Sequence, residues 1–204
     1  MKNFFLTFTI SLTSFYCFGQ KNKTFKTLEE MKAVHPDSVY NVELENYHGQ
    51  SLPEWLFDYK NVVTFKIIGT SQKQIPLSDL TGISKFVNLY YLNVSFTSIA
   101  EISSELASMK ITTLILSGVK INTFKPLFEA MVKSNGESFI YGIDGVDKTN
   151  ILDKEELKLF NKISSDGGYF WETINGKSVK LRRYNFRHYD VKKYLEKMKA
   201  YLKK

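Results

Sequence analysis

An apolar triplet of the form apolar-x-x-apolar-x-apolar recurs along this chain, and it constrains the fold more than any other feature. Its copies begin at Val39, Val62, Leu89 and Ile111, so successive starts are 23, 27 and 22 residues apart. Because alternate side chains of a strand face opposite ways, the last two apolar residues of each copy point to the same side. One unit cannot bury this side alone, so we expect the copies to stack as neighbouring strands of a parallel sheet.

The intervals between the copies carry further apolar residues, which predict the segments that close each coil behind the sheet. These residues lie in 52–56, 75–77, 99–106 and 121–131, and the last interval has the spacing of a helix. The pattern therefore predicts an α/β fold with short connections. An ordinary α/β domain with short buried strands is the alternative, because apolar runs alone do not distinguish the two.

The third copy carries a resemblance to a known family. Residues 89–99 (LYYLNVSFTSI) resemble the leucine-rich-repeat consensus. The opening segment, 27–40, resembles that of short secreted bacterial leucine-rich-repeat proteins, and 18–20 resembles signal-peptide ends common in the Bacteroidetes. The resemblance covers 27–132 and implies a short solenoid whose strand face is a concave ligand surface. The chain departs from the family where it usually has a ladder of asparagines, since those positions hold Tyr47, Thr70, Thr97 and Val119.

The ends of such a solenoid need caps, because its apolar core would otherwise be exposed there. Thr27 and Glu30 have the spacing of a capping box, so we expect a short helix that ends before Pro36. The predicted parts are a signal peptide at 1–19, an N-terminal cap helix at 20–38, about 4–5 leucine-rich-repeat coils at 39–146, and a C-terminal α+β cap at 147–204.

The C-terminal cap is expected to have a helix–hairpin–helix order. A helix is predicted over 153–163, and Asn175-Gly176 is a strong signal for a tight hairpin turn. From Asp190 onward an amphipathic helix is predicted. Its apolar stripe consists of Val191, Tyr194, Leu195, Met198 and Leu202.

The first twenty residues predict the compartment. Met1-Lys2 is a positive start, residues 4–18 have almost no polar residue other than Ser and Thr, and small residues precede a possible cleavage after Gly19. We therefore expect a protein that is secreted, periplasmic or on the cell surface, with no transmembrane segment after cleavage; an uncleaved anchor is the alternative. Cys17 is the only cysteine, so the mature chain would have no disulfide and no thiol nucleophile.

The residues between the inward-facing ones predict the binding surface, because stacked strands bring them into one patch. Tyrosines are suited to contact, since an amphipathic ring buries much area with little loss of entropy. We expect an unknown protein, peptide or glycan to bind there. The candidate residues are Tyr40, Asn41, Glu43, Thr64, Lys66, Tyr90, Tyr91, Asn93, Thr112 and Thr113.

The positive charge of the chain is concentrated at its C-terminal end, which predicts an alternative partner. The formal net charge is +7, but ten Lys and Arg against two acids from Lys180 onward give +8, so the preceding residues carry −1. The alternative function is therefore binding to an anionic envelope surface through the basic helix, with insertion of its apolar stripe; no nucleic-acid partner is expected. The candidate residues are Arg182, Arg183, Arg187, Lys192, Lys193, Lys197 and Lys199.

The sequence offers no pattern for catalysis. None of the three histidines has a second ligand at metal-binding spacing, and no nucleophile-elbow or phosphate-loop pattern occurs. Adjacent acids such as Glu155 and Glu156 look like solvated helix faces rather than a catalytic carboxylate pair. We therefore expect no enzyme, no catalytic residue, no metal and no cofactor.

Overall fold

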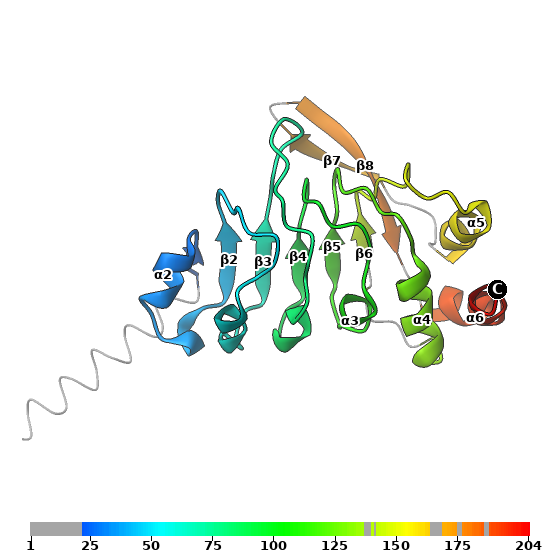
Figure 1. Ribbon diagram of the computed structural model, residues 1–204, viewed down its shortest axis with the longest axis horizontal. Helices are drawn as coiled ribbons and strands as arrows, with labels where there is room; N and C mark the ends of the chain where they lie inside the picture. Colours follow the sequence, from blue (N-terminus) through cyan, green and yellow to red (C-terminus); the bar gives the residue numbers. More distant parts are fainter. Residues whose placement is uncertain (1–21, 137–139, 141, 164–168, 175–176, 186–187) are drawn as a thin grey trace, which may run out of the picture.

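The computed structural model describes residues 22–136, 140, 142–163, 169–174, 177–185 and 188–204, so the expected signal peptide lies outside the described residues. Six parallel strands follow one another in chain order across the sheet (Figure 1). They are β1 (Thr24–Phe25), β2 (Asn41–Leu44), β3 (Thr64–Ile67), β4 (Tyr91–Asn93), β5 (Thr113–Ile115) and β6 (Gly142–Asp144). Beyond β6 the sheet continues with β8 (Lys177–Asn185) and β7 (Tyr169–Ile174), both in antiparallel pairings.

The strand register confirms that the apolar triplets stack. Phe65 pairs with Leu92 and Leu92 with Leu114, on adjacent strands, and Val42 and Ile143 extend this row on either side. All these side chains are fully buried on the same side of the sheet. The period-2 alternation of each triplet therefore produces one continuous apolar face, as expected from the sequence.

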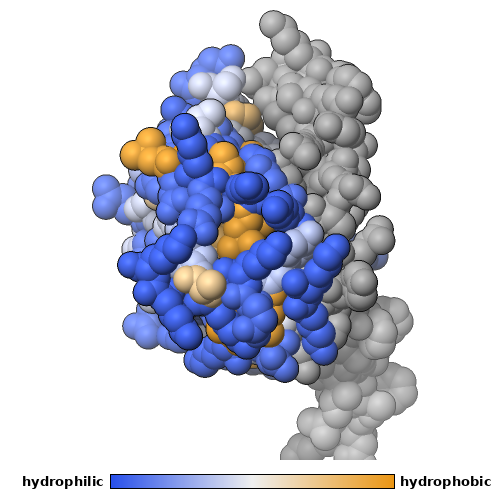
Figure 2. All heavy atoms as spheres, turned by 90° about the vertical axis from the view of Figure 1, so that its right-hand side faces the viewer, coloured by the Kyte–Doolittle hydropathy of each residue, from blue (hydrophilic) through white to orange (hydrophobic). Residues whose placement is uncertain are grey.

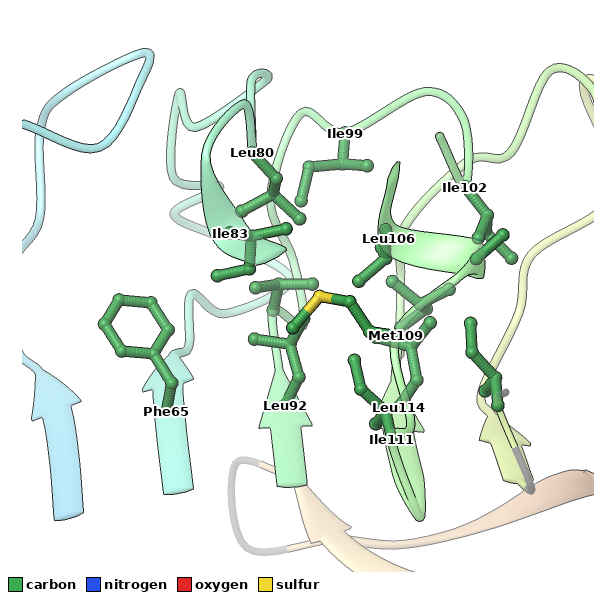
Figure 3. Close-up of a cluster of buried hydrophobic side chains, with 14 of the residues drawn as sticks. Phe65, Leu80, Ile83, Leu92, Ile99, Ile102, Leu106, Met109, Ile111 and Leu114 are labelled. Carbon is green, nitrogen blue, oxygen red and sulfur yellow. The ribbon is translucent and has the colours of Figure 1, made fainter. Parts of the chain in front are cut away.

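Short helical returns cover this apolar face. Figure 3 shows side chains of the strands, among them Phe65, Leu92 and Leu114, pointing toward Ile83 and Leu106 of the returns. The chain thus buries its core between a sheet layer and a helical layer, which is an α/β arrangement. The returns contain the 3-10 helices η2 (Glu54–Asp58) and η3 (Ile83–Lys85) and the α-helices α3 (Ser104–Ala107) and α4 (Lys125–Lys133).

The N-terminal segment differs in detail from the expectation. Helix α2 (Leu28–Lys32) is shorter than the capping pattern suggests, and a 3-10 helix, η1 (Pro36–Ser38), follows it. Thr27 caps α2 by accepting a hydrogen bond from the Glu30 backbone N–H at 3.1 Å, whereas the Glu30 carboxylate accepts from the Lys26 N–H at 2.8 Å. Strand β1 was not expected, because two residues are too short for a periodic signal.

The residues at the positions of the leucine-rich-repeat asparagine ladder make other contacts. Buried Thr97 donates its hydroxyl hydrogen to the Val94 carbonyl at 2.8 Å. Successive loops also bond directly through their backbones, as in the 2.7 Å bond from the Phe96 N–H to the Ser117 carbonyl. The loops are therefore joined without an asparagine ladder.

The C-terminal elements largely follow the predicted order. Helix α5 (Lys154–Ile163) precedes the β7–β8 hairpin, whose turn residues lie outside the described residues, and α6 (His188–Leu202) follows it. The stripe residues Leu195 and Met198 of α6 are buried in the common core, next to α4 and α5. Leu195 and Met198 are therefore not available for insertion into a membrane. None of the helices in the described part of the chain has the length and apolar content needed to span a bilayer.

One carboxylate joins these three helices. Glu156 of α5, expected on a solvated face, is only 4% exposed. Its Oε1 accepts hydrogen bonds from the Thr123 hydroxyl at 2.9 Å and from the Phe124 backbone N–H at the start of α4. Its Oε2 accepts one from the Tyr201 hydroxyl of α6 at 2.9 Å. Glu156 therefore holds α4 and α6 against α5.

Candidate functional site

The strands place two rows of side chains on the side of the sheet opposite the core. The register aligns one row through the first residues of the strands and a second row two positions later. Most of these side chains are half-buried and polar. The first row consists of Asn41, Thr64, Tyr91 and Thr113, and the second of Glu43, Lys66, Asn93 and Ile115.

Alternating charges cross the second row at its β2 end. The Lys26 ammonium donates to Glu43 Oε1 at 2.9 Å, and the Lys66 ammonium donates to Glu43 Oε2 at 3.2 Å. Lys26 also lies 3.1 Å from a carboxylate oxygen of Glu45. The hydrogen bond from Lys26, and then that from Lys66, lowers the pKa of Glu43 against the opposing effect of burial. The hydrogen bonds to Glu43 and Glu45 raise the pKa of Lys26, so Lys26 and Glu43 are oppositely charged near neutral pH.

Tyrosines border these rows where the strands begin. Tyr90 immediately precedes β4 and is 50% exposed. Its backbone is held in place, since its N–H donates to the Val63 carbonyl at 3.1 Å and its carbonyl accepts from the Thr112 N–H at 2.8 Å. The ring of Tyr91 has its centroid 5.9 Å from the Lys66 ammonium. Aromatic and cationic groups are therefore fixed side by side on this face.

Tyr40, Val63 and Thr112 occupy the position in their own repeats that Tyr90 has in the third. The Tyr40 carbonyl accepts from the N–H groups of Val63 and Thr64, so the strand starts are bonded in the same way. Tyr40 is half-buried and Thr112 is exposed. The structure thus brings together the tyrosine and threonine positions predicted from the sequence, at one edge of the strand rows.

Asn93 was predicted to contact the partner, but this prediction is wrong because its side chain is buried. It is 3% exposed, and its Oδ1 accepts hydrogen bonds from the Ser95 N–H at 3.1 Å and the Ser95 hydroxyl at 2.6 Å. Ile115, next to it in the row, is also buried, as is Asp144 on β6. The alternation of side chains along a strand predicts which side of the sheet a residue faces, but other segments of the same chain can still cover that side. The accessible part of the face therefore lies over β2, β3 and the starts of β4 and β5.

Lys26 is a member of this surface that the sequence did not predict. It follows β1, which has no apolar triplet, so nothing in the pattern placed it beside Glu43. Lys26 also lines a hollow of about 570 Å³ at the β2 end, together with Glu45, Tyr47 and His48. The Tyr47 hydroxyl donates to the Ser51 carbonyl there. Lys26 therefore belongs both to the strand face and to a hollow formed by the segments that follow β1 and β2.

The basic candidates are only partly brought together. Lys192, Lys193 and Lys197 are exposed on α6, and Lys199 forms an ion pair with Glu196 at 2.8 Å. Arg182 and Arg183 belong to β8, of which only the backbone is described, and Arg187 lies outside the described residues.

The described part of the chain shows no group of side chains that could form a metal-binding site. Within it, no three His, Cys, Asp or Glu side chains are placed to hold a metal ion. His35 and His48 are exposed, and His35 Nδ1 accepts a hydrogen bond from the Asp37 N–H at 3.3 Å.

Comparisons with known proteins find structural similarity but no family. No family model matches the chain, and no curated protein matches it. One solved structure to which it is similar is a leucine-rich-repeat protein of Leptospira interrogans, with 19% sequence identity and a TM-score of 0.39. The match covers 54% of this chain and 33% of that protein, so it spans about a third of the Leptospira protein's length.

Proposed function

We propose that this chain is a secreted or surface-associated protein-binding module, in which a short leucine-rich-repeat solenoid with a C-terminal cap holds a partner on its strand face. The observation that carries the proposal is the pair of registered rows opposite the core, bordered by Tyr90 at 50% exposure. A sheet side that only had to face water would not need tyrosines at the strand starts. Tyrosine and threonine there provide apolar contact together with hydrogen-bonding groups.

The charges on this face give the proposed interaction its specificity. Lys26, Glu43 and Lys66 alternate in sign across the neighbouring segments, at 2.9 and 3.2 Å. A partner has to present the complementary alternation, since a like charge placed opposite any of these groups would be costly. The same fixed geometry lowers the entropy lost on binding, because the side chains are already ordered.

The proposal is tested by replacing the exposed ring and its neighbour, Tyr90→Ser together with Tyr91→Ser. Partners would first be enriched from the envelope fraction of the producing organism and identified by mass spectrometry. The affinity of the best-enriched protein would then be measured by calorimetry. We expect the double variant to bind about 30-fold more weakly, the effect of losing a central aromatic contact.

The matched control is Val87→Ser, which removes a side chain that is 72% exposed in the turn before β4, outside the strand rows. This control should bind like the unmodified chain, and all variants should unfold at nearly the same urea concentration. Unchanged affinity of the tyrosine double variant would contradict the proposal.

A further inference from the structure

The C-terminal end of the molecule has an excess of positive charge that its own carboxylates do not neutralise. Residues 148–162 and 192–204 contain ten lysines and four acidic residues, a net charge of +6. Two of the carboxylates form ion pairs with lysines of these segments at 2.6 and 2.8 Å, and the other two accept hydrogen bonds from Tyr201. The acidic residues are Asp153, Glu155, Glu156 and Glu196. Each carboxylate already has a partner within these segments, and they are too few to pair with most of the lysines.

Helices α5 and α6 arrange part of this charge around a groove of about 540 Å³. Lys154, Lys158 and Lys162 lie one turn apart on α5, at about 6 Å intervals along the helix. Lys197 lines the groove from α6, and Leu159 adds an apolar side chain. Glu155 also lines it, but its carboxylate is paired with Lys204 at 2.6 Å. The three α5 lysines are exposed, and none of them takes part in the ion pairs found among the described residues. The groove therefore offers a row of cations to a ligand with several negative groups.

An exposed leucine adjoins the lysine row. Leu152, two residues before Lys154, is 91% exposed, more than any other large hydrophobic side chain in the described part of the chain. Figure 2 looks onto this end of the molecule and shows hydrophobic side chains surrounded by hydrophilic ones. A soluble polyanion would engage the lysines but leave Leu152 in water. A bilayer would engage the lysines with its phosphates and take up the leucine side chain.

We propose that this end of the molecule docks on a bilayer that contains anionic phospholipid. The lysines of the α5–α6 groove contact lipid phosphates, and Leu152 inserts at the boundary between headgroups and acyl chains. This mode differs from the one expected from the sequence, because Leu195 and Met198 of α6 stay in the core and α5 supplies much of the charge. Figure 1 places α5 and α6 at one end of the strand rows, so the docked molecule leaves the strand face open to a partner.

The test is co-sedimentation with vesicles of phosphatidylcholine, with and without phosphatidylglycerol, at low and high salt. The protein used spans residues 20–204, since the predicted signal peptide would itself partition into lipid. This form keeps every described core side chain, because these begin at Phe25. The unmodified protein should bind only the vesicles with phosphatidylglycerol, and more weakly at high salt.

Two variants separate the contributions of charge and insertion. Lys154→Gln, Lys158→Gln and Lys162→Gln together should lower the partition coefficient about 100-fold, since each lysine near an anionic surface contributes about fivefold. Leu152→Ser should lower it about tenfold through the lost apolar burial. Both are surface changes and should leave the urea midpoint of unfolding unchanged.

The matched control removes the same charge elsewhere, with Lys73→Gln, Lys110→Gln and Lys120→Gln, all exposed and distant in sequence from α5 and α6. This variant should bind vesicles nearly as the unmodified protein does. The proposal is overturned if the control loses as much binding as the α5 variant, which would indicate unspecific attraction by net charge. It is also overturned if the unmodified protein does not bind vesicles that contain phosphatidylglycerol. A third contradicting result is that Leu152→Ser leaves vesicle binding unchanged and soluble polyphosphate displaces the protein from the vesicles completely, because the ligand would then be a polyanion rather than a bilayer. The double variant Tyr90→Ser and Tyr91→Ser should bind vesicles like the unmodified protein. Partner binding and membrane binding can therefore fail independently of each other.

Discussion

Replacing Glu156 with alanine removes the carboxylate that joins the three C-terminal helices. Three donors would lose a hydrogen bond to this carboxylate: the Thr123 hydroxyl, the Phe124 backbone N–H and the Tyr201 hydroxyl. These donors belong to α6 and to the start of α4, so the substitution weakens the contacts of α5 with both helices.

The magnitude follows from the surroundings of each donor. Phe124 is fully buried, so its N–H would remain without an acceptor, at a cost of about 1–3 kcal/mol. The Thr123 hydroxyl, which is half-buried, also loses its hydrogen bond to the carboxylate, at a further cost of about 1 kcal/mol. The Tyr201 hydroxyl still has Asp153 Oδ2 at 3.1 Å, so it adds little. The expected loss of unfolding free energy is about 3 kcal/mol.

Urea unfolding followed by circular dichroism measures this loss, and the melting temperature should fall by about 6–12 °C. Glu155→Ala is the matched control: this neighbouring residue is exposed and its ion pair with Lys204 should contribute less than about 1 kcal/mol. Glu156→Gln retains an oxygen for the Phe124 N–H and should lose about half as much as alanine. A loss below about 1 kcal/mol for Glu156→Ala, or one equal to that of Glu155→Ala, would refute the reasoning.

Two further predictions concern the backbone and pH. Gly145 has a φ of +70°, and a Cβ there would lie 2.8 Å from Ser117 Cα, so Gly145→Ala should cost about 2–3 kcal/mol in urea unfolding; an unchanged midpoint would show that the loop can rearrange. Burial, followed by the hydrogen bond to Glu156, raises the pKa of Tyr201 above its ordinary value of about 10. The stability from this shift is present below about pH 10 and is lost as the pH rises through the folded-state pKa. The urea midpoint should therefore fall above about pH 10 in the unmodified chain and less in Tyr201→Phe; equal declines would contradict this assignment.

The strand register could be predicted because its signals are local and repeated. Phe65, Leu92 and Leu114 each occupy the same place in an apolar triplet, and they pair on adjacent strands. The hairpin was also predictable, since a two-residue turn determines which residues pair, and Ile174 pairs with Lys177. The strand register and the hairpin are both determined by residues close together in the sequence.

The candidate surfaces were less predictable, because accessibility depends on distant parts of the chain. Asn93 has the alternation of an outward residue but is buried, and Lys26 joins the strand face although no pattern marks it. Glu156 reads as one of two solvated acids, yet it accepts a hydrogen bond at the start of a helix that begins about thirty residues earlier. The spacing predicts the apolar stripe of α6, but the local sequence does not determine whether lipid or protein covers it; the protein core covers Leu195 and Met198.

The sequence by itself determined the spacing of the repeats, the side of each strand that is apolar, and the concentration of positive charge near the C-terminal end. These follow from side-chain periodicity and composition, which need no knowledge of distant contacts. Only the tertiary structure decided which polar residues remain accessible and which lysines of α5 and α6 line one groove. The physical reason is that burial and charge pairing depend on which segments pack together, and that packing joins residues far apart in the chain.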